Sequence, residues 1–178
     1  WIGTYGGGIA KFDGVNWTIY NTSNSDLPND FIMSIKTDSN GDLWSGNTNS
    51  GLVQFDGVNW TIYNTSNSGL PQNQVRAISF DDNGNKWIGT NGGGVALFDD
   101  NNWTAFRTFN SDLPNDYIRD IHVDVNNNKW IATHGGGLVL YKEGGVTSVK
   151  ELSDKILPEG LYLSQNYPNP FNPATIIK

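Results

Sequence analysis

FDGVNWTIYNTSNS, residues 12–25, returns unchanged as residues 55–68, a step of 43 residues. Leu-Pro pairs recur at the same interval, at residues 27–28, 70–71 and 113–114. The tryptophans follow this step in two series that together hold all seven: Trp1, Trp44, Trp87 and Trp130, then Trp17, Trp60 and Trp103. An internal repeat of this length is typical of chains built by stacking one small unit many times.

Each unit contains the pattern of four short strands. In the third unit, residues 74–80, 86–90, 94–99 and 102–107 are rich in β-branched and aromatic residues, and Gly- or Asn-rich turns separate them. Turns this close together leave no room for pairs of helices. Four strands in one unit of this length match a blade of a β-propeller.

The sequence therefore predicts an all-β chain, a β-propeller fragment of four-stranded antiparallel blades across residues 1–150. Trp1 falls in a second strand, so the fragment should hold three full blades plus three strands of another. Propellers close with about four to eight blades, so we expect the chain to be truncated at its amino end. Stacked blades bury both faces of each sheet, and we expect the seven repeated tryptophans to fill the gaps between them.

Composition limits the partners of the protein. With a net charge of −7 and a sequence pI of about 4.5, the chain lacks the basic surface that nucleic-acid binding needs and disfavours anionic membranes. No apolar run is long enough to insert in a membrane. There is no cysteine, and His122 and His134 are the only histidines, too few for a zinc site. We expect no metal and no cofactor.

Residues 1–28, WIGTYGGGIAKFDGVNWTIYNTSNSDLP, closely resemble the two-component-regulator propeller repeat. The resemblance extends to about residue 150. WD40 repeats would show Gly-His and Trp-Asp pairs, and neither occurs here. The resemblance implies a propeller of the kind that bacteria use in periplasmic sensor domains and in secreted proteins.

The carboxyl-terminal stretch resembles the opening of a type IX secretion sorting domain. This implies a linker at residues 151–160 and a truncated sorting domain at residues 161–178. It also implies an extracellular or cell-surface location, with the secretion machinery as a partner, and it favours a free secreted protein over a sensor. The residues that carry this motif are Asn166, Tyr167, Pro168, Asn169, Pro170, Phe171, Asn172 and Pro173.

Two loop types have a functional and a structural interpretation. The triple-glycine corners at residues 6–8, 92–94 and 135–137 suggest phosphate loops, but a strand rather than a helix follows each, which favours a turn. Residues 38–42 and 81–85 resemble part of a calcium loop. They lack the closing glutamate, and their Asn-Gly pairs favour hairpin turns, with weak calcium binding as the alternative.

Two positions vary inside the otherwise constant frame. One follows the second strand and the other lies early in the first strand, so both should cluster at the mouth of the propeller channel. A fixed scaffold with variable rim residues is how loops carry recognition, although neutral drift explains the variation equally well. The first series is Tyr5, Thr48, Asn91 and His134, and the second is Met33, Arg76 and Arg119; all but Met33 are candidate ligand-binding residues.

These residues suggest a binding module rather than an enzyme. Arg76 and Arg119 suit a carboxylate or a sulfate, and Tyr5 suits stacking on a sugar ring, so a glycan or a protein is the expected ligand. No serine lies on a recognisable nucleophile elbow, and we predict no catalytic residue. A propeller lyase or hydrolase, a periplasmic sensor and a passive spacer remain as alternatives.

Overall fold

The computed structural model describes residues 1–142 and 145–148, the last four through their backbone alone. The predicted linker at residues 151–160 and the predicted sorting segment at residues 161–178, with its motif at Asn166–Pro173, lie outside the described residues.

Fifteen strands and no helix form in the described residues, so none of them forms a helix that could cross a membrane. They make four antiparallel sheets in which neighbouring strands follow chain order, and we call these sheets blades 1 to 4. The all-β prediction, with three strands in the first blade and four in each of the others, is confirmed.

Blade 1 holds β1 (Ile2–Gly3), β2 (Ile9–Phe12) and β3 (Trp17–Tyr20). Blade 2 holds β4 (Ile32–Thr37), β5 (Leu43–Asn47), β6 (Leu52–Phe55) and β7 (Trp60–Tyr63). Blade 3 holds β8 (Val75–Phe80), β9 (Lys86–Thr90), β10 (Val95–Phe98) and β11 (Trp103–Phe106). Blade 4 holds β12 (Ile118–Val123), β13 (Lys129–Thr133), β14 (Gly137–Lys142) and β15 (Gly145–Ser148).

Glycine makes the corner between the second and third strands of a blade. Gly94 has a φ of +76°, and a Cβ atom added there would lie 2.1 Å from the carbonyl oxygen of Phe106. Only glycine therefore allows the chain to turn so close to the neighbouring strand. A strand follows this corner, as in a turn and unlike in a phosphate loop.

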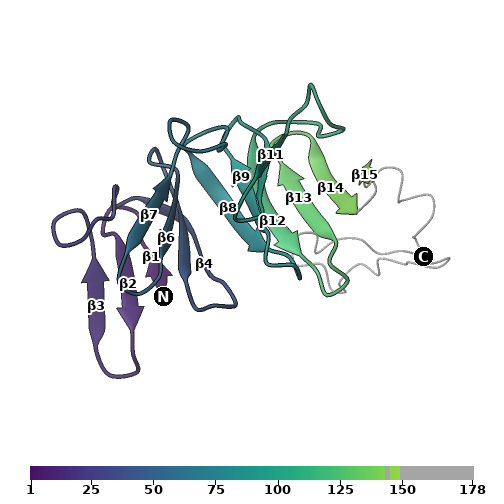
Figure 1. Ribbon diagram of the computed structural model, residues 1–178. Helices are drawn as coiled ribbons and strands as arrows, with labels where there is room; N and C mark the ends of the chain where they lie inside the picture. The colour runs from purple at the N-terminus through teal and green to yellow at the C-terminus, as the bar shows by residue number, and fades with distance from the viewer. Residues whose placement is uncertain (143–144, 149–178) are drawn as a thin grey trace, which may run out of the picture.

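The blades stack in chain order, from purple to green in Figure 1, and a separate apolar cluster fills each junction. The first strands of blades 2 to 4, β4, β8 and β12, form one edge of their sheets, and they pack side by side along the stack. Ile9 packs at the first junction, Trp44 at the second and Trp87 at the third. Each cluster joins residues from two successive blades, so no blade has a core of its own.

The two tryptophan series lie on opposite faces of their sheets. Trp44 and Trp87 are almost fully buried against the following blade. Trp60 and Trp103 face the preceding blade, where their rings lie 5.8 and 5.9 Å from those of Tyr20 and Tyr63. The expectation that all seven tryptophans fill junctions is wrong for Trp17, which stacks on Phe12 and is 54% exposed, because the described chain has no blade on that side.

A hydrogen bond holds the indole of the tryptophan in the second strand of each complete blade. The sequence analysis did not predict this bond. Trp87 Nε1 donates to Asp81 Oδ2 (3.0 Å), and the backbone amides of Asn83 and Asn85 donate to Asp81 Oδ1 (both 3.0 Å). Asp38 and Asp124 bind the indoles of their own blades at 2.8 Å in the same way. The segment at residues 81–85 is a hairpin turn, as the structural interpretation predicted, and its aspartate points inward at the indole.

Candidate ligand-binding rim

A β-bulge lies at the start of each inner strand. In β4, the pairing with β5 passes from Ile32 to Ser34 and leaves Met33 as an extra residue. The pairings of β8 and β12 skip Arg76 and Arg119 in the same way. A bulge bends the strand and re-aims the side chain that it carries. Three blades thus present their variable residue from the same irregular position.

The second variable position adjoins the bulge in every complete blade. The amides of Thr48, Asn91 and His134 each donate to the carbonyl oxygen of the residue just before the inner strand of their own blade. These acceptors are Phe31, Gln74 and Tyr117, at N···O distances of 3.2, 3.0 and 2.8 Å. This backbone frame is the same in blades 2 to 4, while the side chains on it differ. We use the name rim for these six residues together with the three bulge residues and Tyr5 of blade 1. The rim comprises Tyr5, Phe31, Met33, Thr48, Gln74, Arg76, Asn91, Tyr117, Arg119 and His134.

In blade 3, the rim side chains form a chain of polar contacts. Arg76 Nε donates to Asn91 Oδ1 (3.0 Å), and Asn91 Nδ2 donates to Gln74 Oε1 (2.7 Å). Arg76 and Asn91, which the sequence places 15 residues apart, therefore share one cluster. The amide of Asn91 holds the guanidinium group in place without neutralising its charge.

Blade 4 repeats this arrangement with different residues. An Nη of Arg119 lies 2.7 Å from His134 Nδ1. Because a guanidinium group can only donate, Nδ1 accepts, and the proton of a neutral His134 ring sits on Nε2. His134 thus presents an N–H donor rather than a lone pair. Tyr117 lies beside both clusters, since it also forms an isolated β-bridge with Asn91 of blade 3.

At blades 1 and 2 the rim is aromatic. Tyr5 forms an isolated bridge with Phe31, and their rings meet edge to face at 4.8 Å. Tyr5 is 74% exposed and Phe31 is 41% exposed, so both rings remain open to solvent. Thr48 instead turns its hydroxyl inward and donates to the carbonyl oxygen of Phe31 (3.2 Å).

Three rim residues were not predicted as site residues from the sequence. Phe31, Gln74 and Tyr117 also lie 43 residues apart and also vary, but they sit in the polar linking loop, where variation is unremarkable. The signal that would have found them is their constant distance of two residues before Met33, Arg76 and Arg119. In blades 2 to 4 the structure groups the predicted residues with these three, and Tyr5 of blade 1 meets Phe31 of blade 2.

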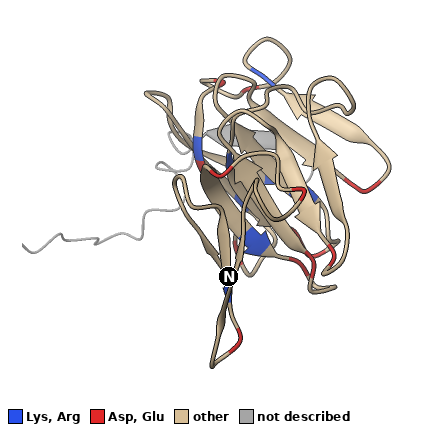
Figure 2. Cartoon of the chain, turned by 90° about the vertical axis from the view of Figure 1, so that its left-hand side faces the viewer, with Lys and Arg blue, Asp and Glu red and all other residues tan. Residues whose placement is uncertain are grey.

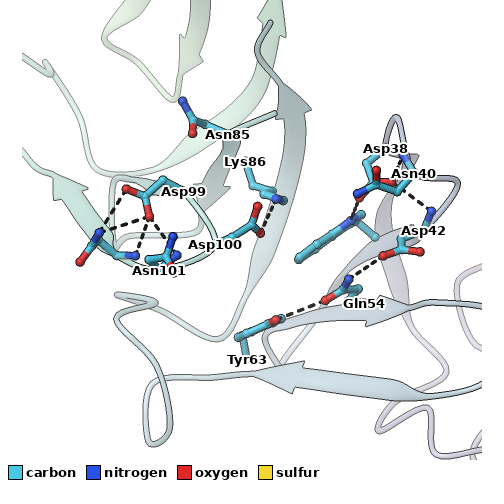
Figure 3. Close-up of polar contacts among 12 residues, drawn as sticks. Asp38, Asn40, Asp42, Gln54, Tyr63, Asn85, Lys86, Asp99, Asp100 and Asn101 are labelled. Carbon is cyan, nitrogen blue, oxygen red and sulfur yellow. Dashed lines mark hydrogen bonds and ion pairs between the residues drawn. The ribbon is translucent and has the colours of Figure 1, made fainter. Parts of the chain in front are cut away.

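A second polar cluster lies at the opposite end of the blades. A cavity of about 420 Å³ opens there between the hairpin turns of blades 2 and 3. Lys86 and Asp100 line this cavity and pair with each other, while in blade 2, outside the cavity lining, Gln54 links Asp42 to Tyr63 (Figure 3). No group of His, Cys, Asp or Glu in the described residues is arranged to hold a metal ion. Each of these contacts joins parts of a single blade, which suits a structural role.

Charge is distributed unevenly between strands and turns. Every described Lys and Arg except Arg107 lies on a strand, whereas every described acidic residue except Asp120 lies in a turn or loop (Figure 2). The lysines that are buried, Lys86 and Lys129, pair with Asp100 and Asp81. Arg76 and Arg119 form no ion pair within the described residues. The rim therefore keeps positive charge in a chain that is acidic overall.

Comparison with known proteins supports the repeat. Residues 26–49 and residues 69–92 each match the family model described as two component regulator propeller. Each match runs from the Leu-Pro loop through the first two strands of a blade, and so includes that blade's rim residues. A search of curated proteins finds no match.

Solved structures share the fold. The extracellular domain of a hybrid two-component system from B. thetaiotaomicron is 29% identical, with a TM-score of 0.67; the match covers 80% of this chain and 20% of that one. The extracellular domain of a one-component system from the same organism is 19% identical, with a TM-score of 0.67, over 88% of this chain and 24% of that one. Virginiamycin B lyase from Staphylococcus aureus is 20% identical, with a TM-score of 0.61, over 80% of this chain and 48% of that one. The chain thus spans only a minor part of the first two relatives, carries two-component-regulator propeller repeats and has the fold of propeller extracellular domains.

Proposed function

We propose that this chain is a non-catalytic, exported propeller module that recognises a ligand at its rim. The observation that carries the proposal is the contrast within the repeat. The backbone frame is the same in each complete blade, while the side chains on it change from aromatic to amide to cationic. Loops on a rigid scaffold carry recognition in this way. A glycan or a protein is the ligand class that these side chains suit.

The rim chemistry favours binding over catalysis. A general base needs an unprotonated atom aimed at the substrate, and the contact with Arg119 occupies the lone pair of a neutral His134 ring. A lyase or hydrolase remains the alternative enzyme class, and its support is the shared fold with virginiamycin B lyase. Fold alone does not carry an activity from one protein to another.

Export is supported by two independent features. The chain resembles extracellular domains in sequence and fold, and residues 166–173 carry the motif that resembles a sorting signal. We propose secretion or surface attachment through that motif. A periplasmic sensor propeller is the alternative, and deleting residues 161–178 in a type IX secretor distinguishes them: loss of the protein from the medium and cell surface supports sorting, and unchanged export rejects it.

A binding screen tests recognition at the rim. The full chain is screened by thermal shift against neutral and acidic oligosaccharides and short peptides, and Kd values are measured for the hits. In the rim variant, Tyr5→Thr with His134→Asn, each position receives a residue that another blade uses. We expect binding to weaken roughly tenfold or more, which corresponds to about 1.4 kcal/mol. Lys36→Met, at the far end of β4, should leave Kd unchanged. Ligands that bind the rim variant with an unchanged Kd would place recognition outside the rim.

A further inference from the structure

The rim is divided by polarity along the stack of blades. Tyr5, Phe31 and Met33 make an aromatic and apolar section over blades 1 and 2. Arg76, Arg119 and His134 make a donor-rich section over blades 3 and 4. The inner strands β4, β8 and β12 lie side by side, so the two sections are neighbours on one surface.

The donor-rich section is prepared for an oxyanion. Only one nitrogen of Arg76 and one of Arg119 contact the protein in these clusters, at Asn91 and at His134, and both partners are uncharged when the imidazole is neutral. Other guanidinium N–H groups are left to meet a ligand, and a guanidinium group binds carboxylate or sulfate through paired hydrogen bonds. Arg107 differs, because it donates to the backbone carbonyls of Gly93 and Pro71.

The tautomer of His134 adds to this preference. With Nδ1 accepting from Arg119, the ring offers Nε2–H as a further donor. Tyr117, which is 50% exposed, stands between the Arg76 and Arg119 clusters and contributes a hydroxyl and a ring face. Within the described residues no carboxylate lies within ion-pair distance of either arginine. The positive charge of both guanidinium groups is therefore available to a bound anion.

The aromatic section selects for the rest of the ligand. Tyr5 and Phe31 are exposed large rings in edge-to-face contact, and they cover each other only partly. Exposed aromatic area of this kind gains free energy when a flat or apolar group covers it. An inorganic anion would use the arginines and leave these rings uncovered.

We propose that the rim binds an organic anion, with its carboxylate or sulfate group over blades 3 and 4 and an apolar ring over blades 1 and 2. This inference rests on the proposed function, because it names the chemistry of the ligand that the rim recognises. It predicts that charge and ring are both needed for tight binding.

Three probes separate these requirements. The ¹⁵N-labelled full chain is titrated with 2-naphthalenesulfonate, with neutral 2-naphthalenesulfonamide and with inorganic sulfate. Binding is followed at the Nε–H signals of Arg76 and Arg119 and at the amides of Gly92 and His134. We expect the sulfonate to shift these signals and to bind roughly tenfold or more tightly than either the sulfonamide or sulfate. Added salt should weaken the binding of both anions and leave the binding of the neutral sulfonamide nearly unchanged.

The repeat supplies the matched variant. Arg76→Met with Arg119→Met gives blades 3 and 4 the residue that blade 2 carries at Met33, so the bulges can remain intact. The preference for sulfonate over sulfonamide should disappear, while Lys36→Met, which removes one positive charge away from the rim, should preserve it. Arg76→Gln with Arg119→Gln is the second variant if the methionines disturb the spectrum elsewhere.

Four results would overturn the inference. Equal binding of sulfonate and sulfonamide at the rim would remove the need for charge but leave rim recognition standing. Sulfate binding as tightly as the sulfonate would remove the need for the ring. Shifts confined to the exposed face of blade 1, around Phe12 and Trp17, would place the probe off the rim. If no probe moves the rim signals, the anion inference is wrong, and the oligosaccharide and peptide screen still judges the proposed function separately.

Discussion

The Asp81 carboxylate contacts three side chains as well as the backbone of its own turn. It accepts from Trp87 Nε1 and Asn85 Nδ2, both at 3.0 Å, and Lys129 Nζ of the next blade lies 3.7 Å away. Asp81 and Lys129 are both buried, so removing the carboxylate leaves a charge and an indole N–H without their partner. We expect Asp81→Ala to lower the free energy of unfolding by about 3 kcal/mol, measured by urea denaturation.

Asp38→Ala is the control for that ion pair. Asp38 makes the same backbone contacts with its own turn and the same contact with Trp44, but it has no counterpart of Asn85 Nδ2 and, within the described residues, no lysine at ion-pair distance. We expect it to cost about 1–2 kcal/mol. Equal losses for the two variants would mean that neither Lys129 nor the side chain of Asn85 adds measurable stability through Asp81.

Two of these aspartates should also make stability depend on pH. Burial opposes ionisation of Asp81, but donation from Trp87 and Asn85 outweighs it and lowers the pKa. In Asp124, the indole of Trp130, followed by Asn128, holds the pKa well below its usual range. A carboxyl with a lowered folded-state pKa stabilises the fold above its unfolded pKa of about 3.9, and that stability is lost as pH falls further.

The free energy of unfolding should be flat near neutral pH and should drop below about pH 4. In the variant Asp81→Asn with Asp124→Asn, this drop should be less steep. An unchanged slope in that variant would assign the acid sensitivity to other groups.

At the scale of single strands, the sequence was a reliable guide. The strands expected at residues 86–90 and 74–80 form at Lys86–Thr90 and Val75–Phe80, because local turn residues set their ends. The bulges at Arg76 and Arg119 were out of reach, since a bulge depends on how two strands share hydrogen bonds and not on either sequence alone. The contact of Arg119 with His134 follows from that bulge, and so could not be derived beforehand.

Glycine corners give a prediction for the elements they join. Gly94 and Gly84 both have a positive φ, at +76° and +80°, but a Cβ added at Gly84 would meet nothing within 4 Å. Gly84→Ala should cost about 1–2 kcal/mol for the backbone conformation alone. Gly94→Ala adds a collision with the carbonyl oxygen of Phe106 and should cost several kcal/mol more, or prevent folding. Thermal unfolding of the two variants measures the difference, and similar melting temperatures would show that the corner can open.

Across the whole molecule, the junctions between blades are similar in shape but not in polarity. Leu43 fills a position at the first junction that buried lysines take at the other two: Lys86 Nζ lies 5.2 Å from the ring centre of Trp44, and Lys129 Nζ lies 5.4 Å from that of Trp87. The repeat predicted stacking, since each unit is too small to bury its own faces. The lysines were not anticipated, because their burial depends on aspartates of other turns, Asp100 and Asp81.

The stacked architecture predicts that three tryptophans at equivalent repeat positions contribute unequally to the free energy of unfolding. Trp60 and Trp103 contact tyrosines of the preceding blade, so Trp60→Ala and Trp103→Ala should each lower the free energy of unfolding by about 2–3 kcal/mol. Trp17→Ala removes the same side chain from a face that no described blade covers, and should cost less than about 1 kcal/mol in urea denaturation. The three sites share one repeat position, so differences in local strand propensity cannot explain the contrast. A loss at Trp17 as large as that at Trp103 would instead show that this face is covered in solution, by a part of the chain outside the described residues or by a second copy.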